Sequence, residues 1–210
     1  MSRKLLVATR NPGKVREYAA MLSNLDVDWL SLDDVGISEE VPETADTFVG
    51  NALLKAAGYA AEAHMLTLAD DSGLQVDALG GAPGVQTARY GGEGLSHEQR
   101  YHLLLEDLKD VPLPERDARF RCVIALADAE GNILGTSEGI CEGQIALAPA
   151  GEGGFGYDPV FYLPELDKTM AEISAEHKHE ISHRGRALQA IAPLLQRIVA
   201  PGEQGAADGA

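Results

Sequence analysis

Basic residues, cysteines and long apolar runs are scarce in this chain of 210 residues. Its 17 Lys and Arg stand against 33 Asp and Glu, for a formal net charge of −16. This argues against nonspecific binding to nucleic acid or to an anionic membrane surface, which requires a basic face, although a local basic cleft remains compatible with it. No run of 18 or more apolar residues occurs, so no membrane-spanning segment is expected. Residues Met1 to Lys4 lead directly into an apolar segment without the features of a signal peptide, which favours a cytoplasmic protein.

The two cysteines, Cys122 and Cys141, are too few for a disulfide framework and lack the spacing of a zinc site. In a reducing cytosol we expect two free, mostly buried thiols. They flank a turn-like segment at 128–132, so a hairpin there would make them near cross-strand neighbours.

The order of apolar patterns predicts an α/β protein, with hydrophobic residues making up 45% of the chain. Residues 1–200 are expected to form one domain, because no linker separates independent units, and the Gly/Ala-rich tail 201–210 is expected to be disordered. Helices are expected at 14–24, 47–63, 96–108 and 183–199. Strands are expected at 5–9, 26–32, 65–69, 120–128, 133–147 and 160–163, the fourth and fifth as part of an antiparallel hairpin or meander.

The most informative segment is Asp70-Asp71-Ser72-Gly73, which follows the apolar run 65–69. We interpret it as the end of a strand at the rim of a site, because neighbouring side chains on a strand point to opposite faces and two carboxylates are costly to bury. The alternative is a turn at the strand end, in which Gly73 supplies a positive φ. Together with Glu43, these oxygen ligands suit Mg²⁺; alternatively, Glu43 is one solvated acid among 33.

Three further segments carry residues suited to binding a ligand. Residues Thr9 to Lys14 form a turn between a strand and a helix that could bind an anion, although they do not match the Walker A pattern. The alternative is a turn without a ligand, in which Asn11 or Thr9 caps the helix. The segment 153–159 is rich in glycine, which lets the backbone approach a flat ligand closely. Phe155 could then stack on a base, and Asp158 could accept from a ring N–H. The alternative is a glycine-rich turn whose aromatic residues belong to the core. Ser182 is expected to cap a helix, which places His183 and Arg184 in its first turn. The helix dipole disfavours cations at this end, so the pair indicates a binding partner with an anionic or carbonyl group. The alternative is that both side chains are simply charged and exposed to solvent.

Five segments in this order and spacing resemble the inosine triphosphate pyrophosphatase family, the pyrophosphatases of non-canonical purine nucleoside triphosphates. They are ATRNPGK (8–14), TFVGNALLKA (47–56), ADDSGLQVDALGGAPGVQTARY (69–90), GGFGYDP (153–159) and KHEISHRG (178–185). The resemblance implies an α/β fold with a long central mixed sheet and two lobes around a cleft. It also implies a homodimer and Mg²⁺-dependent hydrolysis of ITP, dITP and XTP to the monophosphate and pyrophosphate.

Carried over by position, the resemblance makes Asp71 the proton acceptor and a metal ligand, with Glu43 as second ligand. It assigns the remaining site residues to the substrate: Thr9, Arg10, Asn11, Pro12, Gly13, Lys14, Lys55, Ser72, Phe155, Gly156, Tyr157, Asp158, Lys178, His183 and Arg184. Two residues depart from the family pattern: Arg10 stands where many members have Gly, and Gly50 where many have Glu.

In this interpretation Asp71 accepts a proton from the attacking water. Arg184 or His183 donates a hydrogen bond to O6 of the purine, a contact that adenine cannot make because it lacks an acceptor at that position. Two rival functions remain. One is a Maf-like (septum-inhibitor-like) pyrophosphatase of modified pyrimidine nucleotides; the other is a nucleotide-binding protein without turnover.

Overall fold

The computed structural model describes residues 3–200, so the expected disorder of the tail 201–210 lies outside the described residues. The strands are β1 Arg3–Val7, β2 Val27–Leu30, β3 Thr67–Val76, β4 Asp117–Ala127, β5 Ile133–Ile145, β6 Phe161–Leu163 and β7 Lys168–Thr169. The helices are α1 Pro12–Met21, α2 Phe48–Ala63, α3 His97–Asp107, α4 Ala175–Ile181 and α5 His183–Val199. Within residues 3–200, no helix combines the length and the apolar character needed to cross a bilayer.

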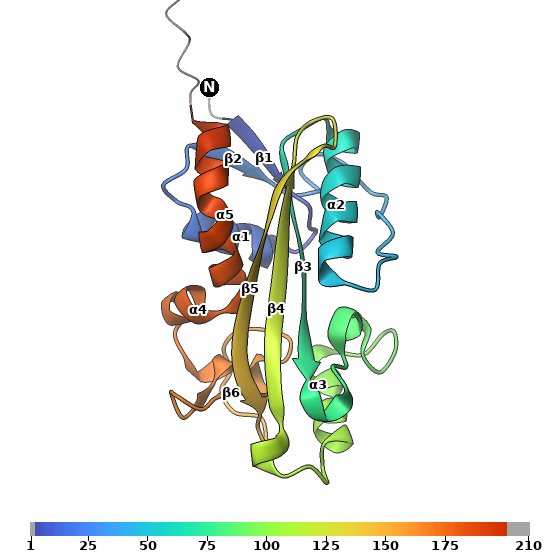
Figure 1. The fold of residues 1–210 in the computed structure, drawn as a ribbon, viewed down its shortest axis with the longest axis vertical. Coiled ribbons are helices and arrows are strands. Elements are labelled where there is room, and N and C mark those ends of the chain that lie inside the picture. Colours follow the sequence, from blue (N-terminus) through green and yellow to red (C-terminus); the bar gives the residue numbers. More distant parts are fainter. Residues whose placement is uncertain (1–2, 201–210) are drawn as a thin grey trace, which may run out of the picture.

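These strands form one mixed sheet in the order β2-β1-β3-β4-β5-β6-β7. The β1 strand runs parallel to both of its neighbours, whereas the pairs from β3 to β7 are antiparallel. Strands β3, β4 and β5 are long and run through most of the height of the molecule (Figure 1). The expected α/β fold with a long mixed sheet is therefore confirmed, including the hairpin of β4 and β5.

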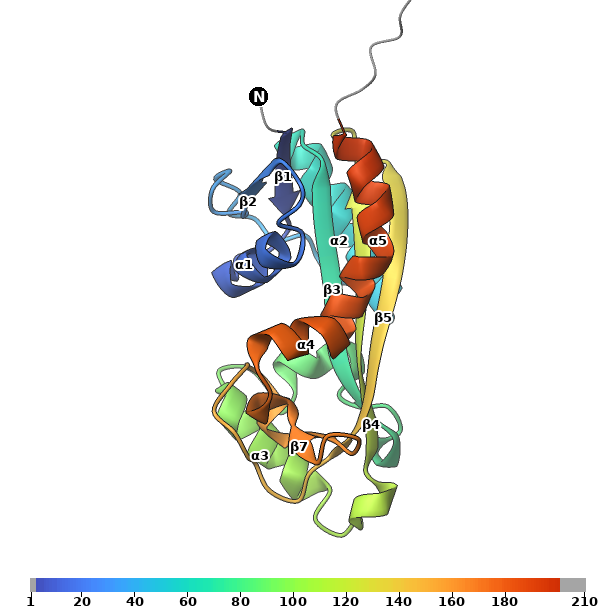
Figure 2. The same cartoon turned by 90° about the vertical axis from the view of Figure 1, so that its left-hand side faces the viewer.

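Three apolar clusters divide the molecule into two lobes that share the long strands. In the upper lobe, α1 and α5 pack on one face of the sheet through residues such as Tyr18 and Leu188, and α2 packs on the other through Ala52 and Ala56. In the lower lobe, α3 and the segment around β6 enclose a third cluster. Figure 2 shows the two lobes stacked along the strands, with α4 at their junction. The two-lobed architecture is confirmed.

Local signals located most helix starts correctly. Asn11 caps α1 by accepting from the Gly13 N–H at 2.8 Å, and Ser182 caps α5 by accepting from the Gly185 N–H at 3.2 Å. The sequence pattern predicted neither α4 nor the two-residue strand β7. Cys122 and Cys141 are both buried, and because Cys122 pairs with Gly139 and Cys141 with Phe120, the two cysteines lie diagonally across the hairpin.

The expected end of the third strand is wrong. Strand β3 does not end before Asp70 but continues to Val76, which pairs with Ala118. Asp70 and Asp71 therefore lie inside a strand, and both are buried, with 3% and 8% of their surface exposed. The local pattern misses this arrangement because the cations that compensate the two carboxylates come from distant parts of the chain.

Candidate active site

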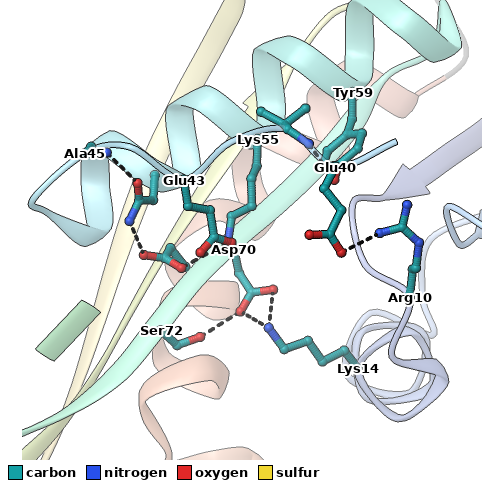
Figure 3. A network of polar contacts seen from close by, with 12 residues as sticks. Arg10, Lys14, Glu40, Glu43, Ala45, Lys55, Tyr59, Asp70 and Ser72 are labelled. Carbon is teal, nitrogen blue, oxygen red and sulfur yellow. Dashed lines mark hydrogen bonds and ion pairs between the residues drawn. The ribbon is translucent and has the colours of Figure 1, made fainter. Parts of the chain in front are cut away.

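A cleft opens where β1 ends beside β3. The two strands pair only at Leu6 with Thr67 and at Val7 with Leu68, whereas β3 continues for eight more residues. The turn into α1 crosses this edge and carries Lys14 toward Asp70 (Figure 3). The cleft measures about 510 Å³ and is lined by Ala8, Thr9, Arg10, Lys14, Leu32, Glu40, Val41, Pro42, Glu43, Lys55, Tyr59, Asp70 and Arg89.

Asp70 faces the α1 and α5 side of the sheet and is held by cations. Lys14 Nζ donates to both of its carboxylate oxygens, at 3.0 and 2.8 Å, and Arg184 Nη2 lies 3.7 Å from Oδ2. The Ser72 hydroxyl donates to the same oxygen at 2.7 Å. Burial alone would raise the pKa of Asp70, but these positive charges outweigh it and hold the pKa below its usual range. Asp70 is thus a carboxylate that the surrounding cations favour in its ionised form.

Asp71 faces the α2 side, in a different environment. Lys55 Nζ donates to its Oδ1 at 3.0 Å and Asn51 Nδ2 to its Oδ2 at 3.3 Å. The same Lys55 ammonium donates to Glu43 Oε1 at 3.0 Å, so one lysine joins both carboxylates. Here burial outweighs the lysine, and the pKa of Asp71 is raised above its ordinary value. Burial would lower the pKa of Lys55, but Asp71, Asp70 and Glu43 together raise it.

Arg10 and Gly50 each have a clear structural consequence. The Arg10 guanidinium donates to Glu40 and to the backbone carbonyls of residues 37, 38 and 39, so it ties the turn before α1 to the loop before α2. Gly50 lies against Ala45: an added Cβ would stand 2.4 Å from the Ala45 Cβ. A larger residue at position 50 would therefore require the loop around Ala45 to move.

The segment 153–159 forms a loop around a buried carboxylate. Asp158 Oδ2 accepts from the Phe155 N–H at 2.7 Å and from Lys178 Nζ, so this side chain organises the loop. Phe155 is 42% exposed, with Lys178 Nζ 4.6 Å and Arg184 Cζ 5.5 Å from its ring centroid. Gly156 adopts a φ of +66°, and the Tyr157 hydroxyl donates to the Thr87 carbonyl at 3.1 Å. An exposed ring beside two cations presents a surface for a flat, electron-rich ligand.

The first turn of α5 places His183 and Arg184 inside the protein. The His183 ring stacks on Phe120 at 4.7 Å between centroids, and burial together with the nearby cations lowers its pKa, so the imidazole is neutral. Arg184 Nη1 donates to Glu17 Oε2 at 3.1 Å. The buried atoms His183 Nδ1 and Arg184 Nε have no hydrogen-bond partner, which leaves both side chains with capacity to bind a ligand.

Comparison with known proteins identifies the family. The family model of the Ham1 family matches residues 5–194. The chain belongs to the Ham1 family.

Curated and structural relatives cover almost the whole chain. Proteins named dITP/XTP pyrophosphatase from Geobacillus kaustophilus and Escherichia coli (strain K12) are 48% and 46% identical to it, over 94% and 92% of this chain and 96% and 98% of theirs. The structure of a HAM1 protein from Coxiella burnetii matches with a TM-score of 0.85 at 38% identity, over 93% of this chain and 99% of that one. A nucleoside-triphosphatase / dITP/XTP pyrophosphatase from Mycobacterium abscessus matches with a TM-score of 0.74 at 45% identity, over 90% and 99%.

Most sequence-predicted site residues of this Ham1-family protein converge on the junction of the two lobes. Thr9, Arg10, Lys14, Glu43 and Lys55 line the cleft. Asp71 reaches this group through Lys55, and Lys178 and Arg184 surround Phe155.

The prediction missed several residues that contact this group, among them Asn51, Glu17 and Arg89. One signal was available for Asn51, which precedes Lys55 by one helical turn on the otherwise apolar stripe of α2. Arg89 ends the 3-10 segment Gly84–Arg89 and lies within the segment 69–90 that resembles the family, but nothing in its immediate neighbourhood distinguishes it as a site residue.

The oxygen ligands of the site suit a hard divalent cation. Among the described residues, no group of three or more His, Cys, Asp or Glu forms a dedicated metal cage. Glu43 and Asp71 do converge, because both accept from one ammonium group. Two carboxylates completed by water and substrate phosphates match the preference of Mg²⁺, which rarely uses an all-protein cage. The donor set therefore fits Mg²⁺ held jointly with a nucleotide.

Proposed function

We propose that this Ham1-family protein hydrolyses non-canonical purine nucleoside triphosphates (ITP, dITP and XTP) to the monophosphate and pyrophosphate. Two independent lines support the proposal. Relatives named dITP/XTP pyrophosphatase are 44–48% identical to this chain over nearly their full length. The cleft also combines paired carboxylates with several cations, which suits the hydrolysis of a polyanionic substrate.

The observation that carries the mechanism is the contrast between two adjacent aspartates. Asp70 is bound by Lys14 and Arg184 and has a lowered pKa, so it is a poor proton acceptor. Asp71 has a raised pKa and is oriented by Lys55 and Asn51. Environments that separate the pKa values of neighbouring acids are typical of sites with divided roles. We therefore assign proton transfer to Asp71 and electrostatic support to Asp70.

The proposed step transfers one proton to Asp71. A water oxygen bonds to the α-phosphorus while the bond from that phosphorus to the bridging oxygen of the β-phosphate breaks. Pyrophosphate leaves with the bridging oxygen, and Asp71 takes the proton of the attacking water and returns it to solvent. Glu43 and Asp71 would hold Mg²⁺ together with the substrate, and the ion would supply charge neutralisation and a lower pKa for water.

The basic residues of the cleft hold the phosphates in this proposal. Lys14 and Lys55 line it, and Lys14 lies in the first turn of α1, a helix end that favours anions. The assignment of Thr9 to Lys14 and of Lys55 to phosphate contacts, and of Ser72 to a substrate contact, follows the resemblance. Of these residues Thr9, Arg10, Lys14 and Lys55 line the cleft. A nucleoside triphosphate carries about four negative charges, which these groups offset within an otherwise acidic protein.

The base is proposed to bind at the loop of Phe155 to Asp158. The exposed Phe155 ring stacks on the purine, and Lys178, His183 and Arg184 supply donors nearby. Hypoxanthine and xanthine present an acceptor at O6 and a donor at N1, whereas adenine presents the reverse. A buried donor left unpaired discriminates by up to about 10⁴.

We further propose that the protein is a homodimer, following the resemblance of its sequence motifs. Size-exclusion chromatography with light scattering gives the mass of the protein in solution directly. A dimer has twice the 22.3 kDa of the chain. A single species at the monomer mass would contradict this assignment.

The test of the function is pyrophosphate release from ITP, dITP, XTP, dUTP, GTP and ATP, with Mg²⁺ and after its removal by EDTA. We expect turnover of the non-canonical purines that is lost with EDTA and restored by added Mg²⁺. Turnover of pyrimidine nucleotides alone would instead support the Maf-like alternative. Binding without any turnover would identify a nucleotide sensor.

A further inference from the structure

We infer that Tyr18 is a positioning residue for Arg184: its buried hydroxyl accepts a hydrogen bond from Arg184 Nε when the purine base binds, and this bond fixes the orientation of the guanidinium. The inference rests on the proposed function, because it concerns the base of that substrate. Within residues 3–200, the buried side-chain atoms without a hydrogen-bond partner are Tyr18 Oη, Arg184 Nε and His183 Nδ1. Tyr18 and Arg184 thus supply an unused acceptor and an unused donor to the same part of the protein.

Helix α1 brings Tyr18 to the guanidinium. The Tyr18 side chain has none of its surface exposed and packs in one apolar cluster with Leu68 of β3 and Leu188 of α5. The preceding residue, Glu17, accepts from Arg184 Nη1 at 3.1 Å. Two successive residues of α1 therefore lie beside Arg184, one with a carboxylate and the other with a hydroxyl.

The Tyr18 hydroxyl lies next to charged groups. Burial raises the pKa of Tyr18 well above its ordinary value, and the negative charge of Asp70 raises this pKa further. Arg184 acts on the same pKa in the opposite direction, both by its charge and as a hydrogen-bond donor. The phenol is therefore protonated, and its oxygen has lone pairs to offer to an N–H group.

Arg184 is buried, with 4% of its surface exposed, but its three nitrogens are unequally bound. Nη1 donates to Glu17, whereas Nη2 lies 3.7 Å from Asp70 Oδ2, beyond a normal hydrogen bond, and Nε has no partner. A buried polar group without a partner raises the free energy of the protein. One bond between Nε and the Tyr18 hydroxyl would satisfy both orphaned groups, so a small turn of the guanidinium toward Tyr18 is favourable.

The proposed base site gives a reason for this turn. Arg184 Cζ lies 5.5 Å from the centroid of the Phe155 ring, on which the purine is proposed to stack. A guanidinium is a rigid plane, so drawing one of its Nη groups toward a base carbonyl rotates all of its N–H groups together. A bond from Nε to Tyr18 and a bond from Nη1 to Glu17 would then hold this plane from α1 while it faces the base.

The alternative is that Tyr18 serves packing alone. In that case the aromatic ring fills the space between α1, β3 and α5, and the hydroxyl contributes nothing to ligand binding. Tyr18→Phe separates the two roles, because it keeps the ring and removes a single oxygen. Neither role predicts a less stable protein, since the deleted hydroxyl has no hydrogen-bond partner in this structure.

Calorimetric titration with inosine monophosphate and with pyrophosphate tests the inference without requiring turnover. We expect Tyr18→Phe to weaken binding of the monophosphate by about 10-fold, the effect of losing one hydrogen bond to a charged group. Binding of pyrophosphate, which has no base, should be unchanged. The matched control is Tyr162→Phe, which removes an exposed hydroxyl that donates to Asp167 at 2.8 Å in the lower lobe. This control should bind both ligands as the wild type does.

A double-mutant cycle shows whether the hydroxyl acts through Arg184. In an Arg184→Ala background, Tyr18→Phe should have no further effect on binding of inosine monophosphate. An equal loss in the presence and in the absence of Arg184 would overturn the inference, because the hydroxyl would then act elsewhere. Unchanged monophosphate binding in Tyr18→Phe would overturn it as well, and so would equal weakening of monophosphate and pyrophosphate binding.

Steady-state kinetics with ITP provide a second readout and separate this inference from the proposed function. We expect Tyr18→Phe to raise KM about 10-fold and to leave kcat near the wild-type value, because the hydroxyl orients a group that binds the base and does not touch the reacting atoms. A lowered kcat with an unchanged KM would overturn the positioning role. A wild type that hydrolyses no purine nucleotide would refute the proposed function itself.

Discussion

Exchanging each of the two adjacent aspartates for asparagine should separate activity from stability. In Asp71→Asn the side chain keeps its shape, and Lys55 keeps Glu43 as a partner at 3.0 Å. Because burial already disfavours the ionised form of Asp71, a neutral residue there should leave the free energy of unfolding nearly unchanged. Loss of the proton acceptor should lower kcat by roughly 10²–10⁴.

Asp70→Asn should instead lower the free energy of unfolding. It leaves Lys14 without its carboxylate and the buried Arg184 guanidinium with only Glu17 at 3.1 Å. Removing one partner from a buried ion pair costs about 3–5 kcal/mol, a large share of a typical unfolding free energy of about 5–15 kcal/mol. Since the folded state lowers the pKa of Asp70, this contribution is present above about pH 4 and is lost on acidification. The stability difference from the wild type should therefore narrow as the pH falls below about 4.

Urea denaturation followed by circular dichroism, over a series of pH values, measures the stability of both variants. Pyrophosphate release from ITP measures their activity. The reasoning would be refuted by Asp71→Asn retaining kcat within about tenfold of the wild type, since general-base catalysis contributes more than that. It would also be refuted by Asp70→Asn being as stable as the wild type at neutral pH.

Three further predictions concern selectivity, pH and packing. Arg184→Ala should narrow the ratio of kcat/KM for ITP to that for ATP, and an unchanged ratio would move the base contact elsewhere. The kcat/KM for ITP should fall on acidification with a midpoint above about 3.9, the ordinary pKa of an aspartate, because Asp71 must be ionised to accept a proton and its pKa is raised; a midpoint at or below that value would exclude Asp71. Gly139→Ala should cost about 1–3 kcal/mol in urea denaturation, because its Cβ would lie 2.1 Å from the His183 carbonyl oxygen and 2.4 Å from the Ala187 nitrogen. Unchanged stability of that variant would mean that α5 shifts freely on β5.

The sequence by itself determined the features that depend on neighbouring residues. The starts of α1, α3 and α5 follow from Asn11, Ser96 and Ser182, whose side chains accept from backbone N–H groups two or three residues ahead. The β4–β5 hairpin follows from two long apolar patterns around one turn. The motif order also indicated the family, because its five segments are contiguous stretches whose spacing can be recognised without the fold.

Only the tertiary structure decided which charges meet. Asp70 lies inside β3 because Lys14, 56 residues earlier in the chain, neutralises it, and nothing within the local sequence around Asp70 records that contact. Glu43 and Asp71 share Lys55 because α2 crosses β3 at that point. Arg89 reaches Glu43 from the other lobe. Local propensity is set by neighbours along the chain, whereas the burial of a carboxylate depends on partners that arrive through the fold, and these partners give Asp70 and Asp71 their different chemistry.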